Sequence, residues 1–290
     1  MTCSLATSDS ALNRPSPGDR VWPISPSQLV NDAPLFARLG MFMLLLMVPT
    51  GFAALIDDRL LYGVNVWVKP LKFELALAVY LLTLAFFARY APTLPRRKLS
   101  YHVFEHVVAT AIVAEMIWIG GAAAFGIASH FNTSEPFMAA IYGLMGMAAV
   151  ILTSASVVQA WHIHGNAATG LSPAVKSGIV TGLALTLPLT LVTAGYMSSA
   201  GGHGVGGTGV DAGGLPLMGW LRDGGDLRVA HFFATHSLHV IPAFAIASAA
   251  LFGPGQVMPV RAFAAAFALF VLIVFAQALI GQPFLASLGA

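Results

Sequence analysis

The chain has 290 residues, of which 57% are hydrophobic and only 9% are charged, with a mean hydropathy of +0.80. Because a soluble domain carries about 25% charged residues, this composition excludes a soluble globular protein. The net charge of +2, from 14 basic and 12 acidic residues, is too small and too scattered for a nucleic-acid surface. The single cysteine, Cys3, excludes a disulfide framework and a thiolate metal site.

The first 33 residues are rich in Ser, Pro, Asp and Asn and contain no apolar run. A segment of this composition cannot bury enough apolar surface to fold, so residues 1–33 are predicted to form a disordered polar tail. The tail lacks the basic and then apolar order of a cleavable signal peptide. We therefore expect the first apolar run to stay in the membrane as an anchor.

Seven apolar runs follow the tail, each about long enough to cross a bilayer as an α-helix. Stretches rich in turn-forming residues separate the runs and end the helices. The predicted fold is therefore an all-α, polytopic transmembrane bundle, in which residues 34–290 form one domain. The predicted spans cover residues 34–56, 71–90, 101–128, 137–161, 176–197, 229–252 and 260–281.

The distribution of Lys and Arg near the span ends predicts the orientation of the bundle. With the tail in the cytoplasm, nine of these residues lie on the cytoplasmic side and five on the other side. The cluster Arg96-Arg97-Lys98 is the clearest part of this difference. Because short cytoplasmic loops carry an excess of Lys and Arg, the N-terminus is predicted to lie inside and the C-terminus outside.

Ionisable residues in the third and sixth runs are expected to face the bundle interior, because a charged group in lipid is costly. His231, His236 and His239 follow one another at spacings of five and three residues, which place them within one arc of a helix. Glu115 on the third run lies at a similar depth. We expect Glu115 to pair with His236 or His239; a hydrogen bond to a carbonyl group or a serine is the alternative.

The histidines also suggest a cofactor. Two neutral imidazoles from facing helices are a common way to hold haem in a helical bundle, and the candidate ligands are His106, His236 and His239. His102, Glu105 and His106 share one helix face, as a metal or a proton path needs; solvated side chains at the membrane border are the alternative. No Cys-x-x-Cys-His, His-Glu-x-x-His, Gly-x-Ser-x-Gly or Walker motif is present in the sequence.

Three stretches carry a resemblance to other proteins. They are Trp67-Val68-Lys69-Pro70-Leu71-Lys72-Phe73, Ser129-His130-Phe131-Asn132 and Gly225-Asp226-Leu227-Arg228-Val229-Ala230-His231-Phe232. These stretches resemble an uncharacterised family of bacterial polytopic membrane proteins, over residues 55–242. The resemblance implies a location in a bacterial inner membrane and assigns no activity.

In the predicted topology the three stretches meet at the outer face of the membrane. Lys72, Asp226 and Arg228 are the side chains expected to act there, as catalytic or binding groups. Asp226 can also cap the sixth helix through its carboxylate, and Arg228 can pair with Asp57 or Asp58. A purely structural role for these residues is the alternative.

Three hypotheses for the function remain open. In the first, the chain is a haem- or metal-dependent membrane oxidoreductase. Its ligands, to haem, iron or copper, are then His130, His231 and His236, and Glu115 carries protons.

In the second hypothesis the chain is a transporter or channel for a small solute or ion. Lys69, Lys72, Asp226 and Arg228 then form its mouth, and Glu115 and His239 lie along its path. In the third, the chain is a sensory or assembly subunit without chemistry of its own. The expected partners are the lipid bilayer and a small molecule or ion, with no nucleic acid; the oligomeric state stays open.

Overall fold

A computed structural model describes residues 25–207, 213–216 and 218–285 of the chain. Almost all of its regular structure is helical. The helices are α1 (Pro26–Asp32), α2 (Pro34–Ile56), α3 (Val68–Phe87), η1 (Ala88–Tyr90), α4 (Thr93–Arg96), α5 (Leu99–Phe125), α6 (Pro136–Gly165), α7 (Pro173–Ser199), α8 (Leu227–Thr235), α9 (Ser237–Phe252) and α10 (Met258–Leu279). Two short antiparallel ribbons pair β1 (Leu60–Leu61) with β2 (Val64–Asn65) and β3 (Gly204–Val205) with β4 (Gly225–Asp226).

The structure confirms an all-α polytopic bundle. Six of the described helices are long and apolar enough to cross a membrane, and the bent pair α8–α9 makes a seventh span when its two helices are taken together. Large apolar side chains cover the outside; Leu45 and Leu55 on α2, for example, are 66% and 82% exposed. Because an apolar surface of this extent is unstable in water and stable in lipid, the chain is a multi-pass membrane protein.

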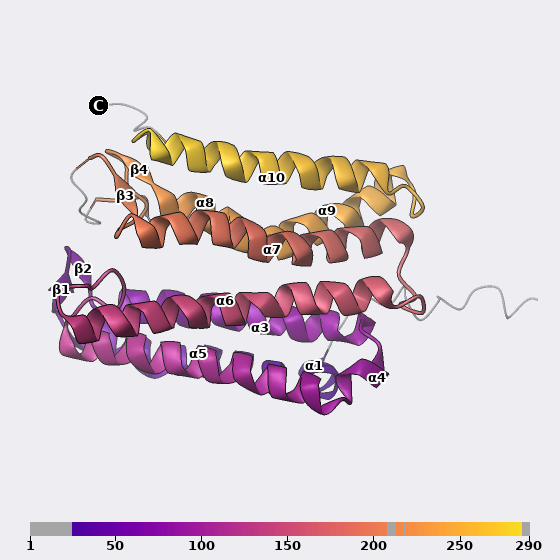
Figure 1. Cartoon of the computed structure of the whole chain (residues 1–290), viewed down its shortest axis with the longest axis horizontal. Coiled ribbons are helices and arrows are strands. Elements are labelled where there is room, and N and C mark those ends of the chain that lie inside the picture. The colour runs from indigo at the N-terminus through magenta and orange to yellow at the C-terminus, as the bar shows by residue number, and fades with distance from the viewer. Residues whose placement is uncertain (1–24, 208–212, 217, 286–290) are drawn as a thin grey trace, which may run out of the picture.

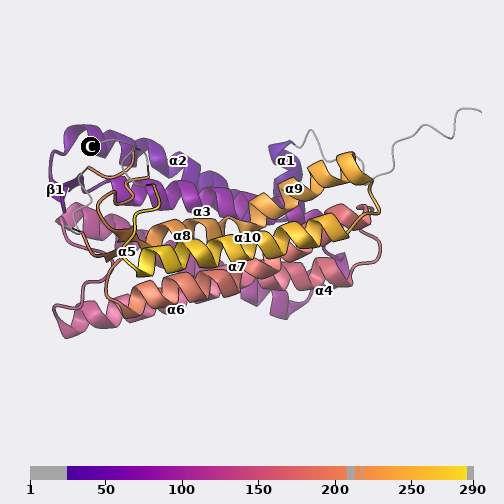
Figure 2. The ribbon, with the colours of Figure 1, turned by 90° about the horizontal axis from the view of Figure 1, so that it is seen from above.

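The spans lie side by side along one axis, so the bundle has two ends (Figures 1 and 2). Both ribbons lie at one end, which we call the ribbon end, and α1 and α4 lie at the opposite end, which we call the α1 end. The connections α2–α3, α5–α6 and α7–α8 are all at the ribbon end. In the predicted orientation this end faces away from the cytoplasm.

Helix α7 joins two apolar cores. The larger core connects α2, α3, α5 and α6 to α7 through Ile179 and Leu183, which are 3% and 0% exposed. The smaller core packs α7 against α8, α9 and α10 around Leu189 and Ile241. In Figure 1, α7 accordingly lies between α6 and α10. Helix α7 therefore contributes to both cores, and the larger core also includes Leu238 on α9.

The predicted span 229–252 is not one continuous helix. It breaks at His236 into α8 and α9, whose axes differ by 52°. The break lies six residues before Pro242, so the proline ring does not cause it directly. The backbone of His236, with φ −88° and ψ 2°, is the cap of both helices. The break places a titratable side chain where the helix changes direction.

Two glycines on α7 allow α9, the second helix of the bent span, to pack close to α7. A Cβ atom at Gly178 would come within 2.2 Å of the Ala245 Cβ, and one at Gly182 within 2.8 Å of both Pro242 Cδ and the Ser237 carbonyl oxygen. Small residues four apart on a helix are the usual means of close helix approach in membranes. The α7–α9 contact therefore depends on the absence of side chains at these two positions.

The predicted disordered tail is wrong for its last residues, which form α1. Ser25 begins this helix with a capping box, in which its hydroxyl accepts from the Gln28 amide and the Gln28 side chain bonds the Ser25 amide. Asp32 then pairs with Arg89 at 3.4 Å. Residues 1–24 of the predicted tail lie outside the described part of the chain.

We predict that Gly182→Ala destabilises the bundle. The added Cβ contacts a proline ring and a backbone oxygen, and neither can move away by changing rotamer. The free energy of unfolding should therefore fall by about 1 to 3 kcal/mol. Gly195→Ala is the control, because nothing lies within 4 Å of its Cβ position on the same helix. Thermal unfolding of both variants in detergent measures the effect, and equal midpoints would show that the α7–α9 contact tolerates a side chain.

Candidate functional site

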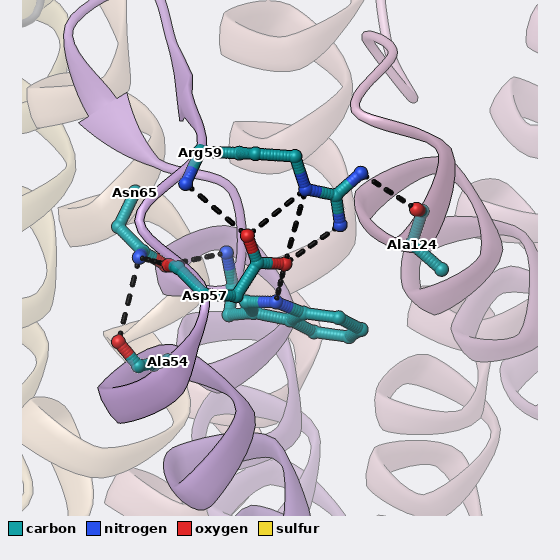
Figure 3. A network of polar contacts seen from close by, with 6 residues as sticks. Ala54, Asp57, Arg59, Asn65 and Ala124 are labelled. Carbon is teal, nitrogen blue, oxygen red and sulfur yellow. Dashed lines mark hydrogen bonds and ion pairs between the residues drawn. The ribbon is translucent and has the colours of Figure 1, made fainter.

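The ribbon end is held first by Asp57, which follows the end of α2 (Figure 3). Its carboxylate accepts hydrogen bonds from Arg59 Nη2 at 2.6 Å and from Trp67 Nε1 at 2.7 Å. The Arg59 guanidinium and then the Trp67 indole hold the pKa of Asp57 well below its usual range. Arg59 Nη1 also donates to the Ala124 carbonyl at the end of α5. One ion pair thus ties α2, the first ribbon, the start of α3 and the end of α5 together.

A second aspartate, Asp226, makes the same arrangement at the start of α8. Its carboxylate, 1% exposed, accepts from the amide of Arg228 and from the Arg228 guanidinium, with the shortest contact 2.7 Å. The Leu221 amide donates to Oδ2 of Asp226 at 2.9 Å, the oxygen that also accepts from Arg228 Nη2. The predicted cap of this helix is therefore confirmed. The expected pairing of Arg228 with Asp57 or Asp58 is wrong, because Asp226 lies within reach two residues earlier.

The first and third of the resembling stretches meet through one loop. Lys72 Nζ on α3 donates to the Met218 carbonyl at 2.9 Å, and Arg228 Nη2 on α8 donates to the next carbonyl, of Gly219, at 2.8 Å. The starts of α3 and α8 are thereby held to the same piece of backbone. Lys72, Asp226 and Arg228, which were predicted as catalytic or binding groups, all serve this connection.

The second stretch places His130 between α3 and α8. Its ring lies 5.4 Å from the Phe73 ring, centroid to centroid, and its Nδ1 is 3.1 Å from the Ser129 hydroxyl. Burial, and then the positive charges of Lys69 and His231 nearby, lower the pKa of His130 to about 3. The imidazole of His130 is therefore neutral at physiological pH and close to His231.

His236 and His239 form a hydrogen-bonded pair at the break. Their Nδ1 atoms are 3.1 Å apart, and His239 Nε2 is 2.9 Å from the Thr83 hydroxyl on α3. The Thr83 hydroxyl donates its own hydrogen to the Val79 carbonyl at 2.7 Å. It must therefore accept from His239, which in the neutral form then carries its hydrogen on Nε2. His239 Nδ1 accepts in turn from His236 Nδ1, which leaves His236 Nε2 as a bare acceptor.

His231 lies on α8 between this pair and His130. It is five residues before His236, and the two imidazoles are close enough for their charges to interact. Its Nδ1 is buried and has no hydrogen-bond partner among the described residues. A buried polar atom without a partner is uncommon and often has a functional reason.

A cavity of about 180 Å³ borders His239. Helices α3, α7 and α9 enclose it, with Thr83 and His239 on its wall and Tyr90 and Leu171 toward the α1 end. It is partly open to the outside. The hydrogen-bonded histidine pair thus borders a space that leads away from the ribbon end.

Glu115 is buried, with 5% of its surface exposed. The pairing expected with His236 or His239 is not formed, since no hydrogen bond or ion pair joins Glu115 to either histidine within the described residues. The reason is geometric. Helix α5 packs on α2, α3 and α6, while both ring nitrogens of His239 are already bonded to His236 and Thr83.

Glu74 is a buried carboxyl group that is not among the residues predicted to act. It is 2% exposed; its Oε1 accepts from the Thr50 hydroxyl at 2.7 Å, and its Oε2 has no partner among the described residues. The signal that could have found it is its place inside the apolar run of α3, where a carboxyl group requires a buried partner.

The residues proposed as ligands do not gather around one point. No group of three or more His, Cys, Asp or Glu residues among those described could hold a metal ion. His106 is exposed on α5, and its Nδ1 bonds the His102 carbonyl one turn earlier. It borders a groove between α5 and α6, whereas His239 borders the cavity between α3, α7 and α9. The structure therefore does not bring His106 together with His239 to hold haem.

Comparisons of the chain with protein-family models, with curated proteins and with solved structures found no match. The function therefore has to be inferred from the residues themselves.

We predict that His130→Gln reduces the loss of stability in acid. With the pKa of His130 lowered from 6.5 to about 3, the unfolded chain binds a proton that the folded protein rejects. The contribution of His130 to stability is complete above pH 6.5 and is lost as pH falls toward 3. The unfolding midpoint should therefore fall less with acidification in His130→Gln than in the native chain.

The matched control is His164→Gln, which replaces an exposed histidine at the α1 end of α6. This variant should keep the pH dependence of the native chain. If His130→Gln and His164→Gln reduce the pH dependence of the unfolding midpoint equally, the burial of His130 is not the source of that dependence.

Proposed function

We propose that the chain is a proton-conducting membrane protein, either a channel or a proton-coupled transporter. The observation that carries the proposal is the hydrogen-bonded pair His236–His239 at the break of a membrane span, with its bond to Thr83. We call His130, His231, His236 and His239 the histidine row. Histidine is the side chain best suited to pass protons near neutral pH, because each ring can bind a proton on one nitrogen and release it from the other.

The hydrogen bonds of the row suggest a direction of transfer. A proton from the ribbon end, passed by His231, binds to the bare Nε2 of His236. His236 then releases its Nδ1 proton across the 3.1 Å contact to Nδ1 of His239. His239 holds two protons at that moment and releases the one on Nε2, beside Thr83, to the cavity. Afterwards each ring carries its proton on the other nitrogen, so the pair must reset before the next transfer.

The broken span supports the same proposal. Non-helical backbone at membrane depth is tolerated where it is buried in protein or lines a cavity, and discontinuous helices form the central sites of many transporters. The break at His236 satisfies both conditions, because α7 packs on α9 behind it and the cavity begins one turn further on, at His239. A structural break without function needs no titratable residue at the bend.

The oxidoreductase hypothesis has less support from the described residues. His130, His231 and His236 are not part of any group able to bind a metal, and His106 does not face His239. No step is therefore assigned to haem or metal. For the setting of the protein we propose a bacterial inner membrane, on the resemblance of the three stretches, with the N-terminus in the cytoplasm.

We predict that His236→Asn strongly reduces proton flux. Asn keeps an amide near the position of Nδ1 but cannot bind a proton on one side and release it on the other. Native protein in liposomes that contain a pH-sensitive dye should acidify the lumen when a valinomycin-driven potassium diffusion potential is applied. The flux through His236→Asn should be lower by about tenfold or more. The variant His239→Gln should show a similar loss of flux while keeping the bond to Thr83.

The control is His164→Asn, which replaces an exposed histidine outside the row and should conduct like the native chain. Unfolding midpoints of all three variants show whether they are folded. The proposal fails if the native chain carries no protons under any gradient, or if folded His236→Asn and His239→Gln conduct normally. A haem absorption band or bound metal in the purified protein would favour the oxidoreductase hypothesis instead.

The orientation can be tested with the only cysteine of the chain, Cys3. A membrane-impermeant maleimide should label Cys3 in inverted membrane vesicles and not in right-side-out vesicles. The variant Cys3→Ser with Thr133→Cys moves the label to an exposed position at the ribbon end. It should show the reverse pattern. Labelling of Cys3 from the outside would reverse the orientation and with it the side from which protons enter.

A further inference from the structure

A long apolar groove runs along the outside of the bundle between α5 and α6. Its volume is about 630 Å³, more than three times that of the cavity at His239. Its walls reach from Leu99 to Ala111 on α5 and from Leu144 to Ile151 on α6. Almost all of the lining is apolar, and side chains such as Val103 and Met147 are 53% and 57% exposed. The groove therefore opens toward lipid and not toward the histidine row.

The length of the groove matches one leaflet of a bilayer. Leu99 and Ala111 are twelve residues apart, which corresponds to a rise of about 18 Å along a helix. The hydrocarbon core of a bilayer is about 30 Å thick, so one leaflet contributes about 15 Å. The groove thus begins at the α1 end of the bundle and ends near its middle. An acyl chain likewise runs from the membrane surface to the middle of the bilayer.

The end of the groove at Leu99 is basic. Arg97 and Lys98, which immediately precede Leu99, are exposed, and their side chains make no hydrogen bond or ion pair within the described part of the chain. His102 is next on the groove wall, and its side chain is 54% exposed. Glu105, on the same helix, is turned inward with 12% of its side chain exposed, and its carboxylate lies 3.5 Å from His102 Nδ1.

We propose that this groove binds one acyl chain of an anionic phospholipid, whose phosphate is held by Arg97 and Lys98. The apolar walls supply the contact with the chain and the two cations supply the selection for negative charge. Basic side chains beside a groove between membrane helices are a usual way to bind anionic headgroups. The α5 helix begins at the same place and no side chain caps its first turn, so its free amides favour a phosphate there as well. A zwitterionic lipid fills the groove equally but gains little from the cations.

The test uses the full chain in detergent, with mixed micelles that contain phosphatidylglycerol or phosphatidylcholine. Phosphatidylglycerol should raise the unfolding midpoint by about 2 to 4 °C more than phosphatidylcholine does. The double variant Arg97→Ser, Lys98→Ser should lose this difference. Arg261→Ser is the matched control, because Arg261 is an exposed cation at the same end, at the start of α10 and away from the groove.

The acyl chain is tested separately from the charge. Ala148→Phe fills the groove while leaving both cations in place, and it should abolish the phosphatidylglycerol effect; Ala149→Phe places the same ring on the neighbouring exposed position. The proposal is overturned if both lipids stabilise the native chain equally, or if the effect survives in the double variant. It is also overturned if inorganic phosphate stabilises the chain as much as the lipid, because the groove would then contribute nothing.

Discussion

Helix α9 can lie at an angle to α8 because α7 presents glycine where the helices touch. In a membrane the apolar effect does not drive helices together, so close packing has to do so. At Gly182 the approach brings α7 onto the Pro242 ring and the Ser237 carbonyl. The same approach keeps the backbone of the break buried in protein. Larger side chains on α7 would move α9 outward, and His239 would leave its partner Thr83 on α3.

The two aspartate–arginine pairs at the ribbon end have the same arrangement of hydrogen bonds. In each, the aspartate accepts the amide and the guanidinium of the arginine two residues later, and the guanidinium also reaches a carbonyl further away. Asp57 and Arg59 fix the first ribbon against α5, while Asp226 and Arg228 fix the second against the loop at Gly219. Because a carboxylate and a guanidinium two residues apart neutralise each other locally, these loops can be held at the membrane border without a long-range partner. The pairs therefore position the starts of α3 and α8.

The sequence predicts the spans well because the requirement of lipid is local. A run of apolar residues must be helical wherever it lies, and six of the seven predicted runs appear as continuous helices with ends shifted by only a few residues. Two of the predictions that fail depend on partners distant in sequence. The pairing of Glu115 requires knowing which helix α5 faces, and the break at His236 requires the glycines of α7. The helix α1 is different, because its capping-box residues Ser25 and Gln28 are close together in the sequence, whereas the prediction of a tail used only the polar composition of residues 1–33.

The contact between His236 and His239 limits what could pass along the proposed path. The two rings are joined by a hydrogen bond of 3.1 Å between their Nδ1 atoms. A hydrated cation is too large to pass between two atoms in hydrogen-bond contact. A proton is not subject to the same limit, because it can cross this hydrogen bond from one ring to the other without its hydration shell. In the proposed path, selectivity for protons would then follow from the direct contact between His236 and His239, which leaves no room for a larger ion between the two rings.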